Sequence, residues 1–136
     1  MARLTAVLAL GLLIASCSAG CGGDDSDPRV SEDSLRSCLA DAGLTLEAPA
    51  AGSNAGFGSA TPDFRATTVE GTAVDLIVLG SDQRAERTAA DIRASRQGFG
   101  GSGDEVLAQD NAVAVFAETP SGGSRGSVES CLGAQD

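Results

Sequence analysis

The chain has 136 residues and a net charge of −10 at pH 7, because 19 acidic residues outnumber nine basic ones. So acidic a chain argues against nucleic acid and anionic lipid headgroups as electrostatic partners. The sequence contains no histidine, which removes the commonest general base and metal ligand, and we expect neither a metal nor another cofactor.

The first 21 residues have the pattern of an export signal. Arg3 precedes an apolar run at residues 4–15, which is too short for a membrane-spanning helix. Small residues and then Cys21 follow, before a stretch rich in glycine and aspartate. This order resembles the signals of bacterial lipoproteins, in which a peptidase cuts directly before a cysteine that then carries the lipid. The resemblance implies a signal peptide over residues 1–20 and Cys21 as the lipidated residue.

Cys17 is the alternative lipidation site. An isoleucine stands three positions before it, as lipoprotein signals prefer, whereas a serine stands three positions before Cys21. Cleavage before Cys21 leaves Cys38 and Cys131 as an even pair. Cleavage before Cys17 leaves Cys21 as an odd thiol in an oxidising compartment, so we favour Cys21. Two or more acyl chains would hold the protein on the extracytoplasmic face of the plasma membrane.

A tether and a helix are expected next. Residues 21–29 are rich in Gly, Asp and Ser and are expected to form a disordered tether. A single domain is then expected over residues 30–134. Its first helix begins after Ser31, whose side chain is the expected N-cap, and ends at Gly43.

The middle of the chain predicts a loop, a hairpin and a helix. Residues 47–62 have no periodicity and predict a long loop. Strands over residues 64–69 and 72–79, with a turn at residues 70–71, predict an antiparallel hairpin. A second helix is expected from residues 80–82 to about Gln97. Its expected inner face consists of Ala85, Ala89 and Ile92.

The last part of the chain predicts a second hairpin and a short helix. After a flexible link at residues 98–103, strands over 105–109 and 112–117 flank a turn at Asp110–Asn111, and a helix covers 124–132. These elements predict an α+β fold, a two-layer sandwich in which a four-stranded antiparallel sheet carries its helices on one face. This is the layout of a ferredoxin-like fold with its first strand moved to the end.

Cys38 and Cys131 both lie on the expected inner faces of helices. They are 93 positions apart and form no Cys-x-x-Cys motif, which argues against redox or metal chemistry. An even pair in an oxidising compartment predicts a disulfide between the first and last helices. Closing so long a loop stabilises a domain by about 2–4 kcal/mol.

Few charged residues occupy positions at which they could take part in catalysis or ligand binding. Asp75 is the one charge inside an apolar strand, and on an open sheet face it most simply points to water. The alternative is that Asp75 and Arg65, on neighbouring strands, mark a sheet surface that faces a ligand. The charged residues of the second helix are expected to form a mixed solvent face. They are Asp82, Arg84, Glu86, Arg87, Asp91, Arg93 and Arg96.

The tether sequence Cys-Gly-Gly-acid and the final Cys-Leu resemble small lipoproteins of actinobacterial type, a resemblance that implies no activity. We expect a non-enzymatic cell-envelope lipoprotein that binds an envelope protein or a wall component, and not nucleic acid. The open sheet face and the loop at residues 47–62 are the expected contact surfaces. An envelope enzyme using the carboxylates of Asp75, Asp104 or Glu105 is the alternative. A purely structural accessory role is a third hypothesis.

Overall fold

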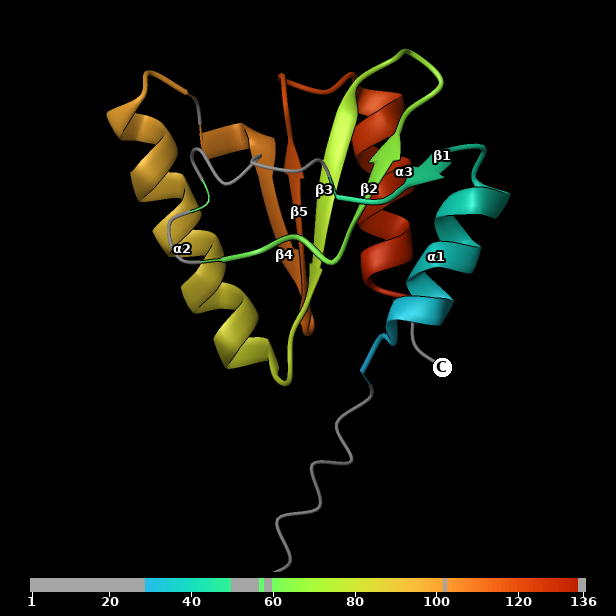
Figure 1. The fold of residues 1–136 in the computed structure, drawn as a ribbon, viewed down its shortest axis with the longest axis horizontal. Coiled ribbons are helices and arrows are strands. Elements are labelled where there is room, and N and C mark those ends of the chain that lie inside the picture. Colours follow the sequence, from blue (N-terminus) through green and yellow to red (C-terminus); the bar gives the residue numbers. More distant parts are fainter. Residues whose placement is uncertain (1–28, 50–56, 58–59, 102, 135–136) are drawn as a thin grey trace, which may run out of the picture.

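In the computed structural model, the described part of the chain (residues 29–49, 57, 60–101 and 103–134) forms a five-stranded antiparallel sheet with helices on both faces (Figure 1). The strands are β1 (Thr45–Glu47), β2 (Phe64–Thr67), β3 (Ala73–Val78), β4 (Val106–Gln109) and β5 (Ala112–Phe116), in the spatial order β1-β2-β3-β5-β4. The helices are α1 (Glu32–Asp41), α2 (Asp82–Gly98) and α3 (Gly122–Leu132), and a short 3₁₀ turn, η1 (Gly103–Glu105), precedes β4. The predicted signal peptide with Cys17 and Cys21, and residues 21–28 of the predicted tether, lie outside the described residues.

Each of these α-helices begins directly after a serine. Ser31, Ser81 and Ser121 have extended backbone, and their side chains accept a hydrogen bond from the backbone N–H three residues later. This arrangement satisfies N–H groups that have no partner within the first helical turn. The predicted cap at Ser31 is confirmed, and the cap at Ser121 explains why α3 begins at Gly122 rather than at residue 124.

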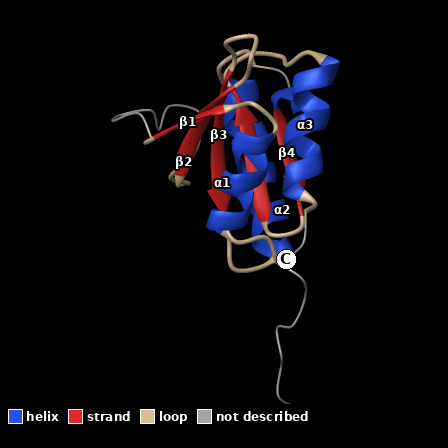
Figure 2. Cartoon of the chain, turned by 90° about the vertical axis from the view of Figure 1, so that its right-hand side faces the viewer, coloured by secondary structure: helices blue, strands red, loops and turns tan. Residues whose placement is uncertain are grey.

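One face of the sheet is covered by α1 and α3, which lie side by side and run roughly along the strands (Figure 2). Phe64 of β2 and Phe116 of β5 are fully buried between these helices and the sheet. Leu35 and Leu39 of α1 belong to the same core. Burying one such side chain contributes roughly 1.5–3 kcal/mol. The buried cluster on this face is larger than the cluster on the opposite face, so this side holds the larger apolar core of the described domain.

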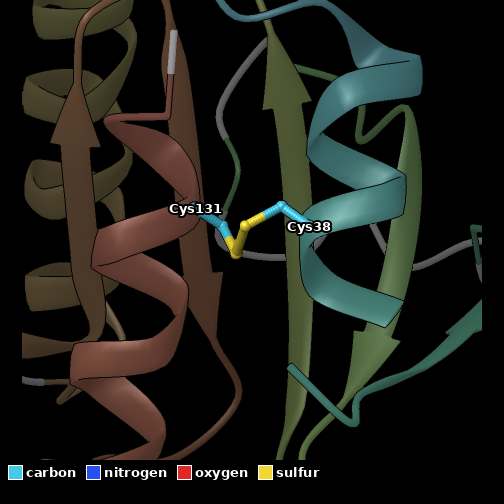
Figure 3. The surroundings of a disulfide bond; sticks show 2 residues. All are labelled: Cys38 and Cys131. Carbon is cyan, nitrogen blue, oxygen red and sulfur yellow. A yellow bond between two sulfur atoms is a disulfide. The ribbon is translucent and has the colours of Figure 1, made fainter. Parts of the chain in front are cut away.

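The predicted disulfide is confirmed, and it joins these two helices. Cys38 of α1 and Cys131 of α3 face each other, with their Cα atoms 5.6 Å apart (Figure 3). Cys131 is only 2% exposed and belongs to the core described above. The bond therefore connects the first helix of the domain to the last, over a sequence separation of 93 residues.

The opposite face of the sheet carries α2, so the prediction that all helices share one face of a two-layer sandwich is wrong. Ala85, Ala89 and Ile92 form the buried side of α2, as predicted, and pack against β4 and β5. The physical reason is that β5 is buried at every position from Ala112 to Phe116. A strand that is apolar on both faces needs a layer on each side.

The prediction of four strands is also wrong, because β1 adds a fifth at the edge of the sheet. Thr45–Glu47 pairs antiparallel with β2, where the sequence predicted no strand between the helix end at Gly43 and the loop that begins at residue 47. Only Leu46 of this strand is partly buried. The predicted α+β class is confirmed, but its permuted ferredoxin-like arrangement differs in strand number and helix placement.

Candidate functional site

Among the described helices, only α2 packs on this second face of the sheet, and it covers part of the width of that face. α2 packs on β4 and β5 at one side. On the other side, the register places Glu47 of β1, Arg65 of β2 and Asp75 of β3 in one row across neighbouring strands. Because side chains alternate along a strand, these three residues lie on the face opposite Phe64 and Ala66. The α2 face is therefore apolar beneath the helix and charged beyond it.

Arg65 and Asp75 form a bidentate ion pair at the centre of this row. Arg65 Nε lies 2.8 Å from Asp75 Oδ1, and Arg65 Nη2 lies 2.8 Å from Asp75 Oδ2. Asp75 is 6% exposed, so the expectation that it points to water is wrong. The reason is that Arg65 is its direct cross-strand partner and can neutralise it within the sheet.

The pairing also acts on the arginine. Hydrogen bonding to Asp75 raises the pKa of Arg65, burial opposes the rise, and the negative charges of Asp75 and Glu47 add to it. The guanidinium therefore stays charged, and the donors used on Asp75 are not open to a ligand. The structure brings Arg65 and Asp75 together, as the alternative hypothesis required, but as partners of each other.

A cavity of about 310 Å³ opens on the same face, between α2, the end of β3 and the segment before β2. Phe57 and Ile77 provide buried apolar surface in its lining. Arg84, Thr88 and Asp91 line it from α2. Its other lining residues are Ala60, Thr61, Asp63, Val78 and Leu79. The cavity thus combines an apolar floor with a charged and hydroxyl-bearing wall.

The spacing of the wall residues explains why they share the cavity. Arg84, Thr88 and Asp91 stand at positions i, i+4 and i+7 and therefore lie along one face of the helix. The buried stripe of Ala85 and Ala89 lies next to this face. Arg84 and Asp91 are exposed, and neither forms an ion pair with any residue in the described ranges.

Two other charged residues of α2 are bound within the fold. The prediction that the charged residues of this helix form one mixed solvent face is therefore only partly correct. Arg93 Nη2 donates to the backbone oxygen of Val106 at 3.2 Å. Arg96 Nη2 lies 2.5 Å from Glu105 Oε2, and these side chains are 17% and 11% exposed. Both contacts tie α2 to the start of β4, on the side of the helix away from the cavity.

Asp63 fixes the edge of the cavity. Its Oδ2 accepts a hydrogen bond of 2.7 Å from the backbone N–H of Val78, and its own N–H donates to the oxygen of Leu76 at 2.8 Å. These bonds extend the β2–β3 pairing by one residue. The predicted contact loop at residues 47–62 thus contributes Phe57, Ala60 and Thr61 to the cavity, while residues 50–56 and 58–59 lie outside the described part.

The carboxylates considered for an enzyme are not brought together as a pair. Asp75 of β3 forms an ion pair with Arg65 of β2, and Glu105 of η1 forms an ion pair with Arg96 of α2. The strand β5 and the edge strand β4 separate β3 from the segment that holds Glu105. The side chain of Asp104 lies outside what the structure describes. No general acid–base arrangement is formed by Asp75 and Glu105.

A second, smaller hollow of about 200 Å³ lies between the end of α1, the β2–β3 turn and the start of α3. Glu70 closes one side of it by accepting hydrogen bonds from the hydroxyl groups of Ser121, at 2.8 Å, and Ser124, at 3.1 Å. Val69 stands beside it and is 80% exposed. A carboxylate from the same chain therefore occupies the N-terminal end of α3.

Sequence patterns alone did not single out the cavity. Arg84, Thr88 and Asp91 follow helical spacing, but that spacing is typical of any solvent-facing helix surface. Only the position of α2 beside β3 shows what they face. In the described ranges no cluster of three or more Cys, Asp or Glu could hold a metal ion, and no helix has the length and apolar character needed to cross a membrane. Comparison with known proteins finds no matching protein-family model, no matching curated protein and no matching solved structure.

Proposed function

We propose that this chain is a lipid-anchored, non-enzymatic binding module of the cell envelope, held by Cys21 on the extracytoplasmic face of the plasma membrane. The observation that carries the binding role is the cavity beside α2, in which Arg84 and Asp91 are exposed and form no ion pair within the described ranges. Charged groups that stabilise nothing within the fold are available to a ligand. An envelope protein or a wall component is the class of partner.

The anchor is supported by the lipoprotein-like signal and by the short distance from Cys21 to the domain. The segment of residues 21–29 spans at most roughly 30 Å when fully extended. The domain would therefore stay close to the membrane surface. The acidic charge of the chain would not attract it to anionic lipids, so attachment would depend on the lipid.

The non-enzymatic character is supported by the state of the buried carboxylates. Asp75 and Glu105 each form an ion pair with an arginine, so their carboxylate oxygens are engaged within the fold rather than directed at a substrate. The described residues that line the cavity include no cysteine, serine or lysine, and within the described ranges neither Thr61 nor Thr88 is hydrogen-bonded to a base that could activate its hydroxyl group. The cavity is suited to binding rather than to covalent chemistry.

Membrane fractionation of the full-length chain tests the anchor. The parent protein is expected in the membrane fraction, with an acylated peptide beginning at Cys21 detected by mass spectrometry. Cys21→Ala should release it to the soluble fraction or retain the uncleaved signal, whereas Cys17→Ala should leave fractionation and the acylated peptide unchanged. An acylated peptide that begins at Cys17 would contradict the assignment.

Site-specific crosslinking in intact cells tests the binding role. A photo-reactive residue at Thr88, inside the cavity, is expected to yield a discrete crosslinked species. The same residue at Ala94, exposed on α2 and outside the cavity lining, is the matched control and should not yield it. Identical crosslinking from both positions, or none from either, would contradict a role for the cavity.

A further inference from the structure

We infer that the cavity beside α2 binds a short peptide that has a free amino end and a free carboxyl end. The inference rests on the proposed function, because it names the class of ligand for the same cavity. Three features carry it: two charges of opposite sign that form no ion pair within the described ranges, an apolar floor in the same cavity, and the length of helix that separates the charges.

The two charges face the cavity from the same wall. Arg84 and Asp91 are seven residues apart on α2, which places their Cα atoms about 10 Å apart along the helix axis. This distance is too long for them to neutralise each other by direct contact. A ligand with a carboxylate at one end and an ammonium group at the other would satisfy both.

The surface between these charges fits a peptide rather than a sugar or a nucleotide. Phe57 and Ile77 are only 5% and 4% exposed and give the cavity its apolar floor, which suits small aliphatic side chains. Thr88 stands between Arg84 and Asp91 and offers one hydroxyl group to a peptide N–H or C=O. Among the described residues that line it, the cavity presents no stacked aromatic residues for a sugar or base and no cluster of cations for a phosphate.

The dimensions set the length of the peptide. An extended chain advances about 3.3–3.6 Å per residue, so three residues bridge the distance between Arg84 and Asp91. The volume of about 310 Å³ lies at the lower end of the range for ligand pockets. A tripeptide with small apolar side chains meets both limits, with its carboxyl end at Arg84 and its amino end at Asp91.

Calorimetric titration of the full-length chain in a non-ionic detergent with trialanine tests this inference. Binding is expected for free trialanine. N-acetyl-trialanine and trialanine amide should each bind about tenfold more weakly or worse, because each lacks one charge-assisted contact. Equal binding of the free and the doubly capped peptide, or no binding of the free peptide at millimolar concentration, would overturn the inference.

Variants of Arg84 and Asp91 test which residue binds the carboxyl end of the peptide and which binds the amino end. Arg84→Gln should abolish the preference for the free carboxyl end and leave the preference for the free amino end, and Asp91→Asn should do the reverse. Arg84→Lys should retain part of the carboxyl preference. Arg87→Gln and Glu86→Gln make the same charge changes on α2 outside the cavity lining, and they should leave all affinities unchanged. Equal effects of cavity and control variants would overturn the assignment.

The two levels of the proposal fail in different ways. If trialanine does not bind but the crosslink from Thr88 forms and Cys21 carries the lipid, the peptide inference is overturned and the binding module stands. If Cys21 carries no lipid but trialanine binds with the expected end preferences, the anchor is wrong and the peptide site stands.

Discussion

Asn111 forms hydrogen bonds with both the backbone N–H and the backbone oxygen of Val30, which lies 81 positions earlier in the sequence. Its Oδ1 accepts a hydrogen bond of 2.8 Å from the N–H of Val30, and its Nδ2 donates to the oxygen of Val30 at 3.0 Å. The same Nδ2 also donates to the oxygen of Leu79 at 2.9 Å. Asn111 is 3% exposed and lies in the β4–β5 turn, so one buried amide joins the start of the domain to the sheet.

Asn111→Ala is expected to lower the free energy of unfolding by about 2–4 kcal/mol, because it leaves the buried backbone groups of Val30 and the partly buried oxygen of Leu79 without this partner. Urea unfolding followed by circular dichroism measures the change. Asn111→Asp should be at least as destabilising, since its carboxylate would face two carbonyl oxygens. A loss below about 0.5 kcal/mol, typical of an ordinary surface substitution, would contradict this role.

Reduction of the disulfide is expected to lower the free energy of unfolding by about 2–4 kcal/mol, because the unfolded chain loses a constraint over 93 positions. Urea titrations with and without a reductant measure the difference. The variant in which Cys38 and Cys131 are both replaced by Ala is the control, and its unfolding should not respond to the reductant. An identical midpoint for oxidised and reduced parent protein would contradict the expected contribution.

Replacing one partner of the Arg65–Asp75 pair is expected to lower the free energy of unfolding more than replacing both partners with apolar residues. Asp75→Asn leaves the partly buried guanidinium without its counter-charge and should destabilise the fold by about 1–3 kcal/mol. The double variant Arg65→Met with Asp75→Leu should lie within about 1 kcal/mol of the parent, because apolar residues can replace such a pair. Urea unfolding of the single and double variants provides the comparison, and additive losses would refute it.

The pH dependence of this pair follows from the raised pKa of Arg65. A cation whose pKa is raised by folding contributes its full stabilisation below the unfolded pKa, and loses it as the pH rises through the folded pKa. For an arginine both values lie in strongly alkaline solution. The stability difference between the parent and the double variant should therefore be constant between about pH 6 and pH 9. A steep change in that window would show that another group controls the pair.

Glu70 is expected to stabilise the start of α3. Glu70→Gln removes the negative charge from the helix N-terminus and weakens the contacts to Ser121 and Ser124, at a cost of about 0.5–1.5 kcal/mol. Raising the salt concentration should reduce the difference between parent and variant, since exposed charges are screened. Glu118→Gln, an exposed acidic residue outside these contacts, is the control, and equal losses in both variants would contradict the prediction.

The helices and hairpins were predictable because their signals are local. Ser31 and Gly43 bracket α1, and the stripe of Ala85, Ala89 and Ile92 identified the buried side of α2. The face on which α2 packs is not a local property, because the same stripe fits either side of a sheet. The continuous apolar run at residues 112–116 was the available signal for a layer on each side.

The missed features depend on pairing between distant segments. β1 has only three residues, too few for a visible alternation, and it exists because β2 offers it an edge. The burial of Asp75 depends on the register that places it opposite Arg65. The cavity wall of Arg84, Thr88 and Asp91 was visible as a helical surface, but its role depends on Phe57 and Ile77, which come from other segments.

The bond between Cys38 and Cys131 closes almost the whole described domain into a covalent ring. A protease that cuts the backbone once at any site between these residues opens the ring without dividing the molecule. The two fragments would remain joined through their sulfur atoms, and the piece carrying Cys131 would stay attached to whatever holds the N-terminus. Under the proposed anchoring at Cys21, release of the domain would then require a second cut or a reductant.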